Sequence, residues 1–340
     1  MAVAVRSDVD NLRKEFILSL RKKQTRDSSS AIALSVINFL RKVIMVEKAK
    51  TISDLLKSLH AHAKFLSAME PNELIMVNIV LMTSKLARDE LQARKGQEAR
   101  GYDSLYTLWK EHGPSEAEDT DMKKIKKDLI ANIKELIIEI ESCRESIASQ
   151  STELIFNQDV VMVHSLSKSP TLEAFFANAC RSRKFRLLSV VNSAEVDDSP
   201  DYTTPIQFAD VASKIVDTTK VVLPSVAVFP DGSCLVPAGG LSIALVAQKH
   251  SVPVYVLAPF YKMTPFFIPD PCAMNTFKKA AMPFEFSRKS AGLVEIIQPA
   301  FDMIPAQLIN LFVSNSSCII PAHINRLKED YYHPEDISIY

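Results

Sequence analysis

The chain has 340 residues, 47% of them hydrophobic, so it can bury a substantial core, and its length suggests roughly two domains. Forty Lys and Arg balance forty Asp and Glu, which leaves no global field to steer the chain to nucleic acid or to an anionic membrane surface. Only seven residues are glycine, which argues against the glycine-rich loops that hold phosphates, so no nucleotide or other cofactor is expected.

The first half, to about Gln150, is predicted to be all helix, because its apolar residues recur at helical spacing. Ser28–Ser30 precede one apolar run, and Thr51 with Asp54 forms a capping-box pattern before the next. Pro71 suits the first turn of a third helix. We therefore expect an N-terminal helical domain over residues 1–120.

An exposed loop is predicted for Glu111–Asp121, which carries five acids, no Lys or Arg, and the helix breaker Gly113-Pro114. A long connecting helix is expected next, over residues 121–150. Its apolar face comprises Ile125, Leu129, Ile133, Leu136, Ile137 and Ile140. Its charged residues fall mainly on other faces and include Lys123, Lys127, Lys134, Glu135 and Glu141.

The remainder, residues 151–340, alternates short β-branched runs with helical ones, which is typical of a parallel sheet flanked by helices. The predicted strands are Val160–Leu166, Phe185–Val191, Val221–Leu223, Val252–Leu257 and Leu293–Ile297. The predicted helices are Thr171–Arg181, Phe208–Val216 and Leu241–His250. The fold class is therefore α/β. The carboxyl end of this region is rich in aromatic residues and is expected to be an assembly segment.

A soluble, cytosolic protein is predicted. The most apolar run, Leu74–Met82, is far shorter than the ~20 residues that span a bilayer, and the first residues lack the apolar core of a signal peptide. The cysteines are spread widely with no CxxC pair, which fits buried thiols in a reducing compartment and gives no zinc site. His60 and His62, two apart on a helix, diverge and are not expected to share a metal ion.

Three short patterns fall where α/β proteins often place binding or catalytic residues. Gly239-Gly240 opens a helix and could bind an anion there, although a tight turn is the simpler interpretation. His164 and Ser165 lie at the carboxyl end of the first predicted strand, where α/β sheets place ligand-binding residues, but adjacent residues on a strand point oppositely and the chain has no G-x-S-x-G nucleophile elbow. Asp302 before Pro305 predicts a helix start, with the carboxylate as its cap.

The carboxyl half carries the most specific motifs. The run VVLPSVAVFPDGSCLVPAGGLSIALVAQKHSVPVYVLAP, Val221–Pro259, and QPAFDMIPAQLINLFVSN, Gln298–Asn315, resemble the family that unites the alpha, beta and delta subunits of initiation factor 2B with two sugar-phosphate isomerases. INRLKEDYYHPEDI, Ile324–Ile337, resembles the beta branch in particular. The resemblance implies an N-terminal helical domain followed by a Rossmann-like α/β domain.

The same resemblance speaks against catalysis. The isomerases use a cysteine just after the first strand and an aspartate in a GADR-like segment as acid and base, and the matching positions are Ser165 and Val226. The arginine-rich and RPxxQG-like elements that hold substrate phosphate in those enzymes are also missing. The alternative is a cytosolic isomerase acting on ribose-1,5-bisphosphate or methylthioribose-1-phosphate.

By resemblance the role is that of a non-catalytic regulatory subunit of the guanine nucleotide exchange factor for initiation factor 2. The implied partners are a delta subunit in a direct heterodimer, an alpha dimer, the catalytic gamma and epsilon subunits, and the alpha subunit of initiation factor 2, whose phosphorylation the assembly senses. No DNA, membrane, metal or cofactor is implied. Val191–Tyr202 replaces a family helix with an acidic loop, for which we expect little protection in hydrogen exchange.

A subunit interface is predicted from the many aromatic residues after Pro253, because aromatic loops on a surface anchor partners. The alternative is that these rings belong to the domain's own core. The candidate interface residues are Gly239, Gly240, Phe260, Tyr261, Phe266, Phe267, Phe301, Asp302, Pro305, Tyr331 and His333.

Overall fold

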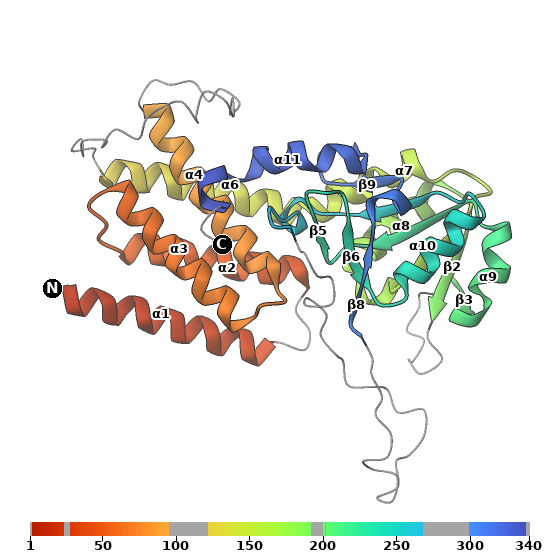
Figure 1. Ribbon diagram of the computed structural model, residues 1–340, viewed down its shortest axis with the longest axis horizontal. Helices are drawn as coiled ribbons and strands as arrows, with labels where there is room; N and C mark the ends of the chain where they lie inside the picture. Colours follow the sequence, from red (N-terminus) through yellow and green to blue (C-terminus); the bar gives the residue numbers. More distant parts are fainter. Residues whose placement is uncertain are drawn as a thin grey trace, which may run out of the picture. The chain divides into compact units, whose positions relative to one another are not determined.

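The structure is a computed structural model that describes residues 2–23, 28–94, 122–191, 200, 202–267 and 299–337 (Figure 1). It divides into two compact units, one of Met1–Glu141 with Arg326–Tyr340 and one of Ser142–Asn325. The residues from Arg326 onward thus belong to the helical unit, whereas the sequence-based prediction assigned them to the α/β domain. The predictions for 111–121, for most of 191–202 and for 293–297 lie outside the described residues.

The helical unit contains α1 (Ala2–Lys23), α2 (Ser29–Val46), α3 (Ile52–Met69), α4 (Leu74–Arg94) and most of α6 (Met122–Ser149). Figure 1 shows α2, α3 and α4 side by side, and each of α2 and α3 contacts α4. Two caps are confirmed, because Ser28 Oγ accepts from the N–H of Ala31 and Thr51 Oγ1 from that of Asp54. Pro71 stands in the turn before α4 and not in its first turn.

The core of the helical unit follows the predicted periodicity. On α6, five of the six predicted apolar positions are buried, namely Ile125, Leu129, Ile133, Leu136 and Ile140. Among the described helices, α2 is the one long and apolar enough to span a membrane by length and composition. Its side chains Val36, Ile37 and Leu40 have no exposed surface, which is what a core helix of a globular unit shows.

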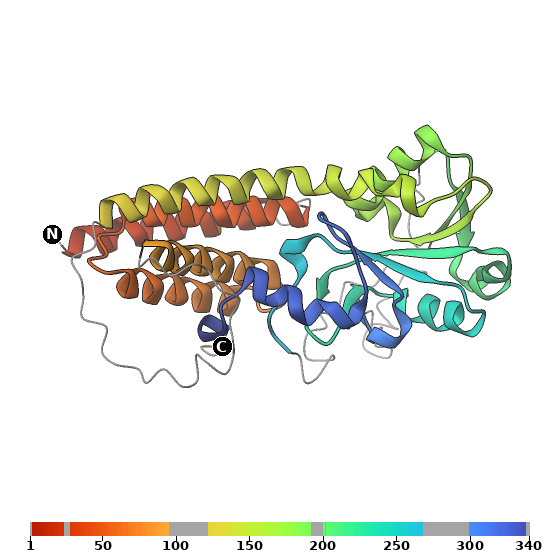
Figure 2. The same ribbon diagram turned by 90° about the horizontal axis from the view of Figure 1, so that it is seen from above.

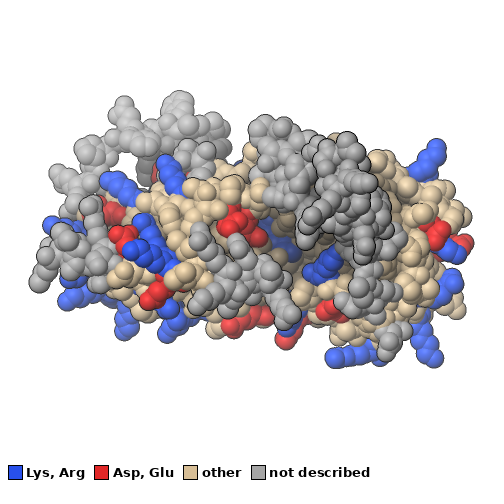
Figure 3. Space-filling view, turned by 90° about the horizontal axis from the view of Figure 1, so that it is seen from below, with Lys and Arg blue, Asp and Glu red and all other residues tan. Residues whose placement is uncertain are grey.

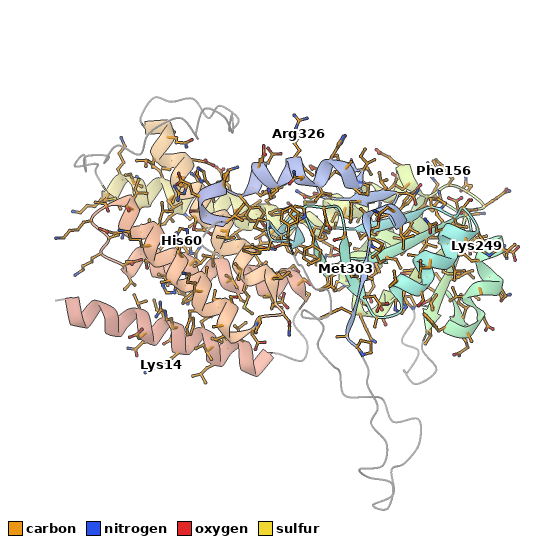
Figure 4. The ribbon with its side chains drawn as sticks, viewed as in Figure 1. Lys14, His60, Phe156, Lys249, Met303 and Arg326 are labelled. Carbon is orange, nitrogen blue, oxygen red and sulfur yellow. The ribbon has the colours of Figure 1, made fainter. Side chains whose placement is uncertain are left out.

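The carboxyl segment of the helical unit consists of the end of α11 (Ile324–Tyr331) and α12 (Pro334–Ile337), and α12 packs on α4. The Asp336 carboxylate is completely buried and lies 2.9 Å from His60 Nε2 on α3 and 2.7 Å from Arg88 Nη2 on α4. Figure 4 shows His60 within the helical unit. Arg88 also pairs with the exposed Glu335 at 2.6 Å. This buried ionic cluster fastens α12 to α3 and α4.

His62 has a different environment from its neighbour on α3. Its ring is fully buried, its Nδ1 accepts from Arg13 Nε of α1 at 3.3 Å, and it meets the Phe39 ring edge to face. The two histidines therefore take separate partners, Asp336 and Arg13, as their spacing predicted.

The second unit is built on a seven-stranded sheet with the order β10-β9-β7-β4-β1-β2-β3. All neighbours are parallel except β10 with β9, so the α/β class is confirmed. Helix α8 (Pro170–Ser182), yellow-green, covers one face and α10 (Gly240–Lys249), teal, covers the other, with α9 (Val211–Lys214) beside α10 (Figure 2). The strand bounds are β1 Val160–His164, β2 Arg186–Val191, β3 Thr204–Gln207, β4 Lys220–Pro224, β7 Val254–Leu257, β9 Leu311–Val313 and β10 Cys318–Ile319.

A small antiparallel sheet of β5 (Ala227–Val228), β6 (Cys234–Pro237) and β8 (Phe301–Ile304) completes this unit. The helix start predicted at Asp302 is wrong, because residues 301–304 form strand β8 and pair with β6. Tertiary pairing outweighs the local capping signal here, as it commonly does for short segments.

Candidate functional site

The order of the large sheet reverses between β1 and β4. From β1 the chain crosses through α8 to β2, and from β4 it crosses through α10 to β7 on the opposite side. In open α/β sheets, ligands bind at the carboxyl edge of such a reversal. Ser165 directly follows β1 and Val226 follows β4, so both positions that match the isomerases' cysteine and aspartate lie at this switch point.

Neither position supplies a group for proton transfer. Ser165 adopts a left-handed backbone with φ 56° and is half-buried, and the Val226 amide donates to the carbonyl of Leu235 at 2.7 Å. A valine cannot carry a proton, and a hydroxyl without an adjacent base has too high a pKa to replace a thiol. Cys234, the thiol on β6, is fully buried, and that burial raises its pKa, which keeps the sulfur protonated.

The start of α10 is occupied by the chain itself. Gly239 has φ +101°, a conformation that favours glycine, and its N–H donates to Asp302 Oδ2 at 2.7 Å. The same oxygen accepts from the N–H of Leu241 at 3.3 Å. Asp302 therefore caps α10 from the neighbouring strand β8, and not the helix that was predicted to begin at Asp302 itself. The N–H groups of Gly239 and Leu241 at the helix start thus already have an acceptor within the chain. This counts against phosphate binding at Gly239-Gly240.

The region next to this cap is closely packed. His164 Nε2 lies 2.9 Å from the carbonyl oxygen of Ala238, and a Cβ added at Gly239 would stand 3.3 Å from that nitrogen and 3.0 Å from the Phe208 ring. A Cβ at Gly240 would meet Val236 at 2.5 Å. The two glycines are thus required by close approach of the backbone, the tight turn that the sequence offered as the simpler interpretation.

The predicted aromatic loop is only partly exposed. Phe260 and Tyr261 have 0% and 3% of their surface accessible and pack edge to face, so their predicted exposure is wrong and they belong to the core of this unit. Phe266 is half-buried and Phe267 is 63% exposed. The interface prediction therefore stays open for Phe266 and Phe267, and the neighbouring rings serve to hold the loop.

The remaining candidates divide between the two units. Phe301 is half-buried on β8 and Pro305 is exposed just beyond it, in the α/β unit, where Figure 4 also labels Met303. Tyr331 and His333 belong to the helical unit. Tyr331 lines a cavity of about 460 Å³ between α4 and α6, and His333 is buried, with its Nδ1 accepting from the N–H of Glu335.

Sequence reasoning missed the ionic cluster of Asp336, Arg88 and His60. Nothing local signals it, because His60 and Asp336 are 276 residues apart. It also missed the groove that the lysines of α6 line together with Met45. The spacing of these lysines, four and seven residues, indicates that they lie on one side of the helix.

The chain is similar in sequence to known proteins. Residues 25–197 and 204–321 match the Initiation factor 2 subunit family. The chain is 28% identical over 227 residues to translation initiation factor eIF2B subunit beta of Dictyostelium discoideum, and 25% identical over 231 residues to ribose 1,5-bisphosphate isomerase of Pyrococcus furiosus. The matches cover 63% of this chain in both cases, 57% of the Dictyostelium protein and 69% of the isomerase.

Two solved structures share the fold. The crystal structure of eIF2B beta from Chaetomium thermophilum superposes with a TM-score of 0.72 at 19% identity, covering 98% of this chain and 93% of that one. A chain of the tetrameric eIF2B-beta2-delta2 complex from the same organism gives 0.69 at 21% identity, covering 98% and 99%. Both likenesses extend through the helical and the α/β units.

Proposed function

The chain belongs to the Initiation factor 2 subunit family, and from that premise we propose that it is a non-catalytic regulatory subunit of initiation factor 2B, of the beta kind. The observation that carries this proposal is the switch point of the sheet, where Ser165 and Val226 replace the thiol and carboxylate that the isomerase relatives use. A switch point that lacks these two groups fits a binding subunit better than an isomerase.

The beta assignment is supported by the Dictyostelium relative, which is itself a beta subunit, and by the resemblance of Ile324–Ile337 to the beta branch. The proposed partner in direct contact is a delta subunit, in line with the composition of the beta2-delta2 complex whose chain shares this fold. An alpha dimer, gamma and epsilon subunits, and the alpha subunit of initiation factor 2 would complete the assembly. In this proposal it works in the cytosol and responds to phosphorylation of that last protein.

The first prediction is that the pure chain turns over neither ribose-1,5-bisphosphate nor methylthioribose-1-phosphate, because neither Ser165 nor Val226 can replace the thiol and the carboxylate of the isomerases. The measurement is product formation followed by NMR, with the Pyrococcus isomerase as positive control. Turnover that Ser165→Ala abolished and the exposed neighbour variant Ser167→Ala kept would establish the rival isomerase function instead.

The second prediction concerns pairing with a delta-type subunit. Co-expression should yield a soluble complex, whereas the chain alone should self-associate, because obligate pairs bury more than ~2,000 Å² of surface in total. Phe267→Ala should weaken the complex by tenfold or more if this exposed ring is an anchor, on the order of the effect of an interface hot spot.

Phe156→Ala is the matched control, since that ring is 55% exposed in the same unit and is not a predicted contact. The binding of each variant to the delta-type subunit can be measured by analytical ultracentrifugation. A stable lone monomer at micromolar concentration, together with equal affinities for Phe267→Ala and Phe156→Ala, would refute the interface.

A further inference from the structure

One face of α6 combines basic and apolar side chains in a continuous stripe. Positions 123, 127, 130, 134 and 138 follow one another at intervals of three or four residues, so their side chains lie along a single side of the helix. They are Lys123, Lys127, Ile130, Lys134 and Ile138. The buried positions Ile125, Leu129 and Ile133 face the core of the helical unit instead.

The stripe borders a groove with a strong local charge. The groove has a volume of about 500 Å³ and is lined by four lysines and one aspartate, in addition to Met45, Ile130 and Ala131. The lysines are Lys123, Lys126, Lys127 and Lys134, opposed by Asp128, which leaves three positive charges in excess (four minus one). The whole chain is balanced, and basic and acidic side chains are interspersed over the face shown in Figure 3.

Two of the most exposed large apolar side chains of the helical unit lie on this face. Met45 is 56% exposed at the end of α2, and Ile138 is 63% exposed one turn beyond Lys134. An ordinary solvated helix face carries charges of both signs and few large apolar groups. Exposed apolar groups rimmed by polar residues are typical of an interaction surface.

The floor of the groove is fixed. The Lys126 ammonium donates to the carbonyl oxygen of Glu47, just after the end of α2, and burial lowers the pKa of that lysine. This contact ties α6 to α2 and uses Lys126 within the fold. Lys123, Lys127 and Lys134 are exposed among the residues that the structure describes, so a partner can reach their ammonium groups.

We propose that this face, the α6 lysine groove, binds an acidic amphipathic helix of another protein chain. The stripe runs for about 22 Å along α6, the length of roughly four helical turns, so a partner helix could meet it along its whole length. Glutamates or aspartates would pair with the three exposed lysines, and apolar side chains would cover Met45, Ile130 and Ile138. Nucleic acid fits less well, because the lining offers no aromatic ring on which bases could stack.

The test is fluorescence anisotropy with the full chain and a synthetic amphipathic peptide of about 18 residues that carries glutamate on one stripe and leucine beside it. The wild-type chain should bind this peptide, more weakly as salt rises. Lys127→Glu with Lys134→Glu should lower the affinity about tenfold or more, because like charges then face each other. Lys57→Glu with Lys64→Glu, exposed on α3, should leave it unchanged.

A second arm replaces the peptide by a single-stranded RNA of about 20 nucleotides. The proposal is wrong if the peptide does not bind, if both double variants behave alike, or if the RNA binds the groove lysines more tightly than the peptide does. It is supported when only the peptide binds and only the groove variant loses it.

The inference deepens the proposed function, since it names the chemistry of a partner, and the two can fail separately. In the complex purified from its own cells, a carbodiimide should couple Lys127 or Lys134 to a carboxylate of another subunit, and Lys→Arg at both positions should abolish that link while leaving the complex intact. Co-purification of a delta-type subunit without peptide binding and without the link overturns the groove alone. Peptide binding by a chain that co-purifies with no subunit overturns the proposed function alone.

Discussion

Replacement of Asp336 by alanine is expected to lower the free energy of unfolding by about 3–5 kcal/mol, because it breaks a buried ion pair. Its carboxylate has no exposed surface and accepts hydrogen bonds from His60 and Arg88. Burial alone would raise the pKa of Asp336, but the hydrogen bonds from His60 and Arg88, together with the electrostatic attraction of both groups, hold the pKa below its ordinary value. Removing the carboxylate leaves the partly buried guanidinium of Arg88 without its main counter-charge.

Glu335→Ala is the control for this experiment. Glu335 also pairs with Arg88, but its side chain is 59% exposed, so its loss should change stability by less than about 1 kcal/mol. Denaturant unfolding followed by circular dichroism compares the two variants with wild type. Equal destabilisation by both would show that the buried carboxylate does not hold α12 in place.

The second large effect is a loss of stability in mild acid that depends on His62. Burial, and then the positive charge of Arg13, lower the pKa of this imidazole to about 4 from 6.5. Above pH 6.5 the ring is neutral in both the folded and the unfolded chain. As the pH falls from 6.5 to 4, His62 becomes protonated in the unfolded chain but stays neutral in the folded chain. The free energy of unfolding should therefore fall by about 3 kcal/mol between these two pH values.

His62→Gln isolates this contribution, because an amide oxygen can still accept from Arg13 but does not titrate in this range. The unfolding free energy of the variant should depend less steeply on pH between 6.5 and 4.5 than that of wild type. His333, whose pKa is lowered by burial and by Arg88, acts in the same direction in both proteins and cancels in the comparison. The exposed His250→Gln should keep the wild-type slope, and an unchanged slope in His62→Gln would disprove the assignment.

The helices and the parallel strands could be predicted from the sequence because their signals are local. The α6 periodicity, the caps at Ser28 and Thr51, and the β-branched runs of β1 and β4 each lie within a few residues of the element they define. The family resemblance then placed Ser165 and Val226, and the strand order explains why they share one edge of the sheet.

What could not be predicted depends on contacts distant in sequence. Asp302 carries the local signature of a helix cap, yet the helix it caps begins 62 residues earlier, at Gly240, and lies beside it only because β8 pairs with β6. Phe260 and Tyr261 follow a strand, where loops usually run over the surface, but a short 3-10 turn folds both rings back into the core.

The contact between His60 and Asp336 has a consequence for synthesis on the ribosome. The two residues are separated by 276 positions. At ordinary translation rates the Asp336 carboxylate is therefore synthesised roughly 15–55 seconds after His60 on α3. During that interval Arg88 has emerged without the carboxylate of Asp336, and His60 without its hydrogen-bond partner, although α2, α3 and α4 can already pack together. The nascent helical unit is then incompletely folded, and the surface of α3 and α4 that α12 later covers is exposed. A chaperone can bind this exposed surface until α12 has been synthesised.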